Sequence, residues 1–151
     1  MKSFSRLVLI LIAIFSSLLY FKSKDKVFHN ELIESNEARL LNLRQLTFYG
    51  ENAEVYFSKD EKHLIFQSHD GDSLCDQIYI INLDEKLVIQ LTGSPDYDVE
   101  ATVAFEGSKT VFTSMVIRDL EIWIMCPSGE RKTQLTNELG YDGGAFFNND
   151  A

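Results

Sequence analysis

Hydrophobic positions follow two different patterns along this chain. Residues 7–21 form one apolar run without a charged side chain, and Lys2 and Arg6 precede it. From residue 45 onward, apolar positions fall in short segments rich in Ile, Val, Phe, Tyr and Thr, each bounded by turn-forming residues. The first pattern predicts an N-terminal hydrophobic helix. The second predicts short β-strands and requires no helix after residue 44.

The N-terminal run resembles an export signal. Basic residues followed by an apolar stretch are typical of secretory signals, and no pair of small residues stands at its end, where the chain reads Leu18-Leu19-Tyr20-Phe21-Lys22. We expect residues 1–21 to be a signal peptide or an uncleaved signal anchor, with residues 4–21 entering the membrane. Residues 22–44 are polar and mixed in charge, which predicts a stalk or linker that ends in a leading strand.

An internal repeat is the most informative feature of the remaining chain. The tripeptide Gln-Leu-Thr occurs at residues 45–47, 90–92 and 134–136, so the spacings are 90 − 45 = 45 and 134 − 90 = 44 residues. Short strands repeating with a period of about 40–45 residues are typical of β-propeller blades. The spacing therefore predicts one blade per repeat.

Three further segments recur in the same order within the repeats. They are residues 54–60, 101–107 and 145–151, residues 64–68 and 110–114, and residues 77–81 and 121–125. Each has the length and composition of a strand, and the run ending at each Gln-Leu-Thr supplies a fourth. The sequence thus predicts an all-β fold of four-stranded antiparallel blades. Residues 45–151 hold two full blades and the start of a third.

These blades resemble the TolB-like β-propeller family, relatives of the WD-repeat propellers, in an exported, periplasmic branch. The resemblance covers residues 40–151, and its motifs are the three Gln-Leu-Thr tripeptides and residues 51–54, 75–79, 97–102 and 141–147. It implies a non-enzymatic binding or scaffold module of the cell envelope that recognises a protein or peptide.

The chain departs from the family pattern in two ways. The Ser-Pro-Asp-Gly turn of the family is degenerate at residues 58–61, 104–107 and 148–151, and Phe105 is unusual in a turn. The family also carries about six blades. We therefore expect Phe112, Phe146 and Phe147 to lack the neighbouring blades on which they would pack, and we expect open blade edges that allow self-association.

The net charge and the absence of catalytic motifs limit the classes of function that fit this chain. The chain has 14 Lys and Arg against 23 Asp and Glu, a net charge of −9, which argues against nucleic acid as a partner because phosphate contacts need clustered cations. It contains no Gly-x-Ser-x-Gly elbow, no His-Glu-x-x-His and no glycine-rich phosphate loop. We predict that the protein is not an enzyme and needs no cofactor.

Acidic residues lie at or just ahead of the expected inner strands, which line the central channel of a propeller. They are Glu51, Glu54, Asp98, Glu100 and Asp142. Acids at this rim either bind a cation or a basic peptide, or cap turns by accepting backbone hydrogen bonds. Tyr97 and Tyr141 precede two of these acids at equal offsets, and we expect them to pack between blades.

Two further groups of residues are candidates for metal binding or for a disulfide. One loop carries His69, Asp70, Asp72, Cys75 and Asp76. Its spacing lacks the remaining positions of a calcium loop and a second His/Cys pair for zinc, so we predict a solvated loop without a metal. Cys75 and Cys126 are able to form a disulfide in an exported protein, but their repeat positions favour two separate thiols.

Two alternative interpretations remain open at this stage. The chain is also compatible with the propeller part of a serine peptidase of the prolyl oligopeptidase type, without its hydrolase domain. It is likewise compatible with a degenerate fragment that has no independent function.

Overall fold

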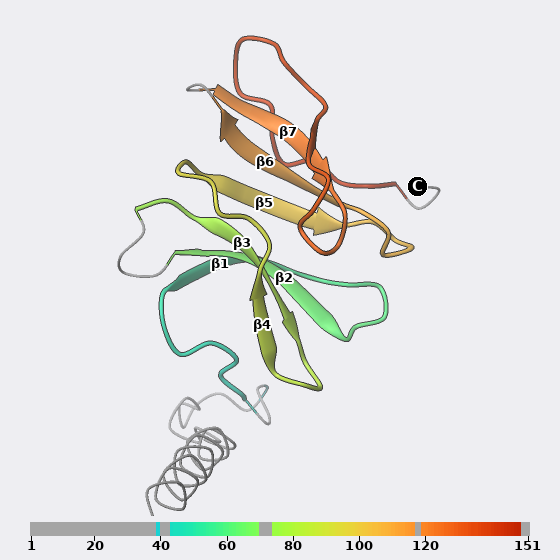
Figure 1. Ribbon diagram of the computed structural model, residues 1–151. Coiled ribbons are helices and arrows are strands. Elements are labelled where there is room, and N and C mark those ends of the chain that lie inside the picture. Colours follow the sequence, from blue (N-terminus) through green and yellow to red (C-terminus); the bar gives the residue numbers. More distant parts are fainter. Residues whose placement is uncertain (1–38, 40–42, 70–73, 117–118, 149–151) are drawn as a thin grey trace, which may run out of the picture. The chain divides into compact units, whose positions relative to one another are not determined.

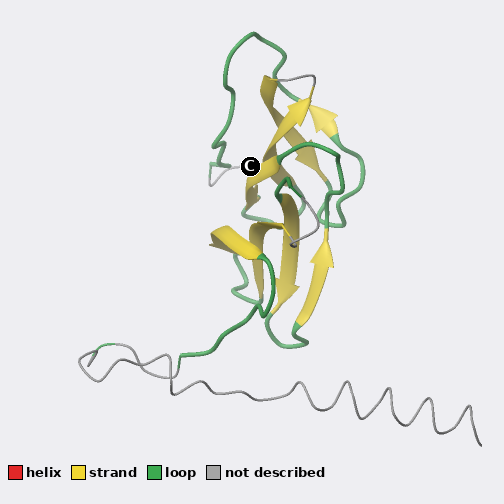
Figure 2. Cartoon of the chain, turned by 90° about the vertical axis from the view of Figure 1, so that its left-hand side faces the viewer, coloured by secondary structure: helices red, strands yellow, loops and turns green. Residues whose placement is uncertain are grey.

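The computed structural model describes residues 39, 43–69, 74–116 and 119–148. The chain divides into two compact units, Met1–Leu46 and Thr47–Ala151, and the fold below is that of the second unit. Its described residues form strands and loops without a helix (Figure 2). A membrane-spanning helix is likewise not found among the described residues. The predicted N-terminal helix and export segment, and most of the predicted stalk, lie outside them.

Two antiparallel sheets of four strands each make up the described unit (Figure 1). The first blade consists of β1 (Glu51–Phe57), β2 (His63–His69), β3 (Gln77–Asn82) and β4 (Leu87–Gln90). The second consists of β5 (Asp98–Val103), β6 (Thr110–Val116), β7 (Asp119–Met125) and β8 (Thr133–Gln134). Strands within each sheet are neighbours in chain order. This confirms the predicted all-β fold of four-stranded blades.

The start of the third repeat is present without a regular strand. The Asp142 N–H donates to the carbonyl of Leu120 at 2.8 Å, just as the Asp98 N–H donates to the carbonyl of Asp76 at 2.9 Å. The Thr102 hydroxyl donates to the Ala145 carbonyl at 3.1 Å. The segment therefore enters the third blade position, but the described residues supply no second strand with which it could form a ladder.

Each inner strand contains a β-bulge at the same repeat position. The register of β1 on β2 shifts between Ala53 and Tyr56, and the register of β5 on β6 shifts between Val99 and Thr102. A bulge places an extra residue in one strand and bends it. Glu54 at φ 50° and Glu100 at φ 54° adopt the left-handed conformation there, and Gly144 at φ 63° occupies the corresponding place in the third repeat.

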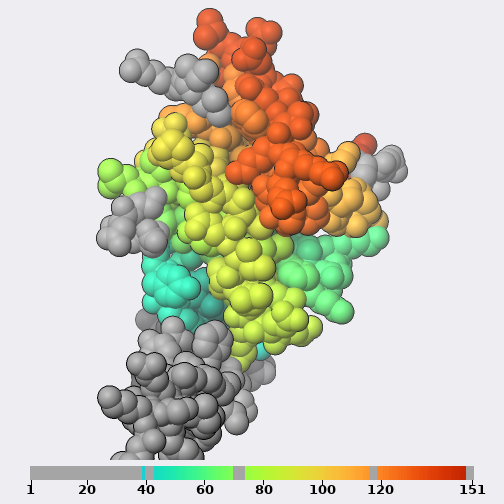
Figure 3. Space-filling view, in the orientation of Figure 1, coloured from blue at the N-terminus to red at the C-terminus, as the bar shows by residue number. Residues whose placement is uncertain are grey.

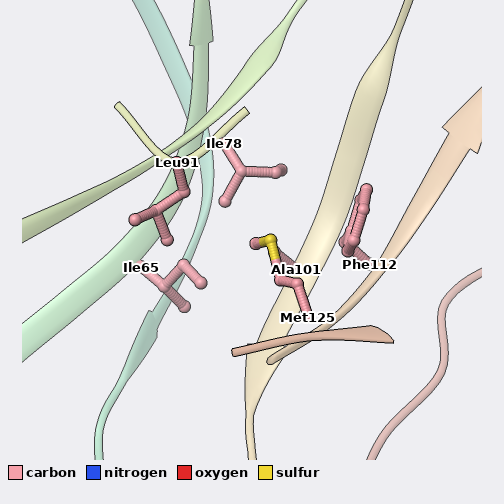
Figure 4. Close-up of a cluster of buried hydrophobic side chains, with 6 residues drawn as sticks. All are labelled: Ile65, Ile78, Leu91, Ala101, Phe112 and Met125. Atoms are coloured by element: carbon pink, nitrogen blue, oxygen red, sulfur yellow. The ribbon is translucent and has the colours of Figure 1, made fainter. Parts of the chain in front are cut away.

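The main hydrophobic core lies between the two blades. Figure 4 shows Ile65, Ile78 and Leu91 meeting Ala101, Phe112 and Met125, all of them buried. The expectation that Phe112 lacks a neighbouring blade is wrong, because its ring faces the first blade and is 2% exposed. Burying such a side chain contributes about 1.5–3 kcal/mol, so Phe112 stabilises the contact between the blades.

The opposite face of the first blade is apolar as well. Leu64, Phe66 and Ile81 form a second buried cluster there. Phe57 lies directly across from Leu64 in the ladder and hence on the same face, yet it is largely exposed. Phe146 is also mostly exposed, and the edge of its ring contacts Tyr56 with 5.5 Å between centroids.

The recurring threonine ties the end of each blade to its third strand. The Thr92 hydroxyl oxygen accepts the Ile78 N–H at 2.9 Å and donates to the Gln77 side chain at 3.1 Å. The Thr136 hydroxyl likewise accepts the Ile122 N–H at 2.9 Å and donates to Glu121. These bonds satisfy polar groups that would otherwise be left without partners, which explains why the tripeptide repeats.

A turn of the second blade approaches the residues that link the blades. A Cβ added to Gly129, at φ 84°, would lie 2.4 Å from the Leu91 carbonyl oxygen, so only glycine fits there. In Figure 3 the orange C-terminal residues lie against the yellow-green residues that connect the sheets. The second blade thus covers Leu91 through its turn as well as through its face.

Candidate binding site on the inner strands

The five predicted rim acids have different environments. Glu51 and Glu54 lie on β1 and are exposed, whereas Glu100 on β5 and Asp142 beyond β8 are half-buried. Asp98, at the start of β5, is 1% exposed. The structure therefore brings some of these acids to the surface and encloses one of them.

Asp98 is held inside the second blade by hydroxyl groups. Its carboxylate accepts hydrogen bonds from Ser114 and, at 3.0 Å, from Ser94. These contacts fasten the entry of β5 to β6 and to the linker that precedes it. A carboxylate with such partners stabilises the strand entry, because a buried charge needs hydrogen-bond donors.

Glu100 accepts more hydrogen bonds than the other rim acids. The Tyr141 hydroxyl donates at 2.7 and 2.8 Å to its two oxygens, the Thr113 hydroxyl donates at 2.9 Å and the Gly144 N–H at 2.8 Å. Burial alone would raise the pKa of this carboxyl, but these hydrogen bonds outweigh burial and lower the pKa below its usual value. Glu100 is consequently anionic at neutral pH.

Glu54 and Glu100 act on the same pair of phenols. The pKa of Tyr56 is raised by burial, by its hydrogen bond to Glu54 at 3.2 Å and by the charges of both glutamates. The pKa of Tyr141 is raised by its hydrogen bond to Glu100, by burial and by the same two charges. The structure thus groups two carboxylates with two tyrosines, which we call the Glu–Tyr cluster (Glu54, Tyr56, Glu100 and Tyr141).

Sequence reasoning missed the two tyrosines of this cluster. Tyr141 was expected to pack between blades, and its hydroxyl does bond Glu100 of the preceding blade, although its side chain is exposed. Tyr97, at the preceding repeat position, is partly exposed too. The equal offsets of Tyr97 and Tyr141 before the acids were the available signal, although they did not reveal the hydroxyl contact.

The candidate metal loop is described only in part, because residues 70–73 lie outside the described residues. His69 Nδ1 lies 2.7 Å from an Asp76 carboxylate oxygen, and the other oxygen accepts the Gln67 side-chain amide at 2.8 Å. Within residues 43–69, 74–116 and 119–148, no three His, Cys, Asp or Glu side chains are grouped as metal ligands would be. Cys75 and Cys126 are not joined by a disulfide.

Comparisons with known proteins bear on the fold. No family model and no curated protein matches the chain. Among solved structures, the crystal structure of TolB from Acinetobacter baumannii matches with a TM-score of 0.55 and 19% identity over 62% of this chain and 23% of its own length. A structure described as TolB from Agrobacterium tumefaciens matches with a TM-score of 0.59 and 17% identity over 65% of this chain and 35% of its own.

These matches confirm a TolB-like β-propeller fold that is present in part. The aligned region spans 23% of one TolB structure and 35% of the other. At this level of identity the similarity extends to the fold alone, because one fold hosts many functions.

Proposed function

We propose that this chain is a non-enzymatic, exported or membrane-tethered propeller module that binds a basic peptide segment of a protein partner in the cell envelope. The Glu–Tyr cluster carries the proposal. Its two carboxylates act on the same phenols, and among the described residues neither forms an ion pair with a lysine or arginine. A cation that binds here would therefore contact two carboxylates that accept hydrogen bonds but have no lysine or arginine partner among the described residues.

The geometry suits a lysine or arginine side chain. Glu100 is fixed by four hydrogen bonds, so it loses little side-chain freedom when a cation binds. Tyr56 and Tyr141 add aromatic rings beside the carboxylates, and such rings attract cations. Glu51 extends the negative surface toward the start of β1.

Long-range charge supports the same class of partner. The net charge of −9 raises the rate at which positively charged partners reach the surface, and added salt weakens this attraction. The basic residues and apolar run within residues 1–21 support export, and the absence of the catalytic motifs sought in the sequence supports a binding role.

The test is titration of the full-length chain, kept in mild detergent, with a fluorescent peptide of alternating lysine and glycine. We expect saturable binding that weakens as salt rises, and at least a fivefold loss in the double variant Glu51→Gln/Glu54→Gln. The matched control is Glu130→Gln/Glu138→Gln, which removes the same charge from exposed positions beyond β7. Equal weakening in both variants would show that only net charge matters and would contradict the proposal.

A further inference from the structure

A groove of about 690 Å³ opens between the blades at the end where the hairpin turns lie. One wall comes from the first blade and contains Ile80, Leu87 and Ile89, and the other comes from the second blade and contains Val103 and Phe105. The volume falls within the range of about 300–1,000 Å³ that is usual for ligand pockets. The groove does not include any residue of the Glu–Tyr cluster.

The first wall is an exposed apolar strip along β4. Leu87 and Ile89 are 50% and 48% exposed, and they share a face because they are two residues apart on a strand. Ile80 pairs directly with Ile89 and continues the strip onto β3. Apolar side chains on the rest of this face are buried against the second blade, so the strip is the part that the blade contact leaves uncovered.

The second wall contains the aromatic residue that the sequence placed unexpectedly in a turn. Phe105 is about half exposed, and the Lys59 ammonium lies 3.3 Å from the centre of its ring. A cation over an aromatic face is attracted to it, so this contact stabilises the position of the ring beside the groove. The degenerate turn thereby supplies an apolar wall.

The strand beside the groove has an open edge. β4 is the last strand of the order β1-β2-β3-β4. It pairs with β3 on one side, and no strand of the described residues pairs with its other edge. An extended peptide can add to such an edge through main-chain hydrogen bonds. Every second side chain of the added strand would then point toward the face that carries Leu87 and Ile89.

The rim of the groove is mainly acidic. Asp60, Glu85 and Glu106 line it together with Lys59, whose ammonium contacts the Phe105 ring. Hydrogen bonds from the Ser58 and Ser108 hydroxyls, the largest influence in each case, lower the pKa of Asp60 and Glu106 respectively. The charges of His63 and Lys62 lower the pKa of Asp60 further, and those of Lys109 and Lys59 lower the pKa of Glu106 further. Asp60 and Glu106 are thus anionic at neutral pH and attract a cationic ligand.

We infer that this groove binds an extended segment of a partner protein in which bulky apolar residues alternate with lysine or arginine. The apolar side chains enter between Ile89 and Phe105, the cations meet the acidic rim and the backbone pairs with β4. This site is separate from the Glu–Tyr cluster and lies at another place on the blades.

The experiment uses the full-length chain in mild detergent and a fluorescent heptapeptide of alternating leucine and lysine, with binding followed by polarisation. We expect saturable binding that Phe105→Ser weakens at least tenfold. Glu106→Gln should weaken binding a few fold and reduce its dependence on salt. A heptapeptide of alternating serine and lysine tests charge alone and should bind at least tenfold more weakly.

Controls separate this site from the proposed function. Glu51→Gln/Glu54→Gln should leave the difference in affinity between the leucine–lysine and serine–lysine peptides unchanged, because that difference comes from the apolar walls of the groove. Each variant is checked for an unchanged thermal midpoint. Equal binding of both peptides, or binding indifferent to Phe105→Ser and Glu106→Gln, would overturn the inference. So would self-association that Phe105→Ser abolishes without any peptide binding, since a second copy would then be the occupant.

Discussion

Leu91 and Leu135 occupy the same position of the repeat but have different surroundings. Each donates its backbone N–H at 2.8 Å to the third strand of its own blade, Leu91 to the carbonyl of Ile78 and Leu135 to that of Ile122. Leu91 is nevertheless 7% exposed and Leu135 56% exposed. The second blade covers Leu91, whereas among the described residues no complete blade covers Leu135.

The comparison separates what a blade achieves alone from what its neighbour adds. The hydrogen bonds of Thr92 and Thr136 are alike, because both partners lie within one repeat. Burial of the leucine depends on the following repeat, since blades in repeat proteins gain stability from nearest-neighbour contacts. Backbone geometry is therefore local, whereas most of the packing energy is shared between blades.

The largest expected effect is at the two leucines. Leu91→Ala should lower the free energy of unfolding by about 3–4 kcal/mol, because it removes a buried side chain and leaves a cavity. Leu135→Ala should change it by less than about 0.5 kcal/mol, as exposed positions usually do. Urea unfolding of the full-length chain measures both, and similar losses would show that Leu135 is also buried in solution.

A smaller difference is expected at the two threonines. Thr92→Val leaves the Ile78 N–H without its acceptor in a buried place, which costs about 1–3 kcal/mol. Thr136→Val removes the equivalent acceptor of the Ile122 N–H, but the Thr136 side chain is only half-buried. Water can therefore accept this hydrogen bond, and we expect a loss of about 1 kcal/mol. Thermal unfolding of both variants tests the order, and a larger loss at Thr136 would reverse the comparison.

The smallest difference is expected at the two bulge glutamates and depends on pH. The pKa of Glu100 is lower in the folded protein than in the unfolded chain, where a glutamate has a pKa of about 4.3. Its charge therefore stabilises the fold at pH values above about 4.3, and this contribution is lost as pH falls through the folded pKa. Glu100→Gln should cost about 1–2 kcal/mol at pH 7, through weakened hydrogen bonds to a former charge. It should cost much less near pH 3.

Glu54→Gln is the matched control for this pH dependence. Glu54 accepts one hydrogen bond, from Tyr56 at 3.2 Å, so its replacement should change stability by less than about 0.5 kcal/mol. Unfolding midpoints measured across pH 3–7 compare the two variants. If Glu100→Gln lowers the free energy of unfolding equally at pH 3 and pH 7, the effect comes from packing and not from charge.

Most of the fold was predictable because segments rich in Ile, Val, Phe, Tyr and Thr recur in the same order in successive repeats. The predicted segments 64–68, 77–81, 110–114 and 121–125 lie within β2, β3, β6 and β7. The alignment of the inner strands β1 and β5 was harder to predict from the sequence. The sequence comparison aligns residues 54–60 with residues 101–107, which are 47 positions later. In the structure, Ala53 and Val99 are equivalent because each is the last residue before the bulge, and they are 46 positions apart. The bulge position has a positive φ, which favours glycine, yet Glu54 and Glu100 occupy it, so the composition of these strands does not mark the bulge.

The candidate site was predictable only at the level of residue type. Acids near inner strands were foreseen, but the enclosure of Asp98 by two serines and the bonding of Glu100 by Tyr141 depend on contacts across 16 and 41 residues. The first contact joins two strands of one blade, and the second joins the start of the third repeat to the second blade. Phe105 shows the same limit, because its role depends on Lys59 in the other blade.

The threonine bonds at the end of each blade also bear on how such chains change length. Because Thr92 and Thr136 close their own repeats, a segment of one period can be inserted or lost between equivalent residues while each junction keeps its local bonds. Recombination within the repeat would then alter the number of blades in whole steps. What such an event changes is the outermost surface, where a new or missing neighbour decides which leucine faces solvent.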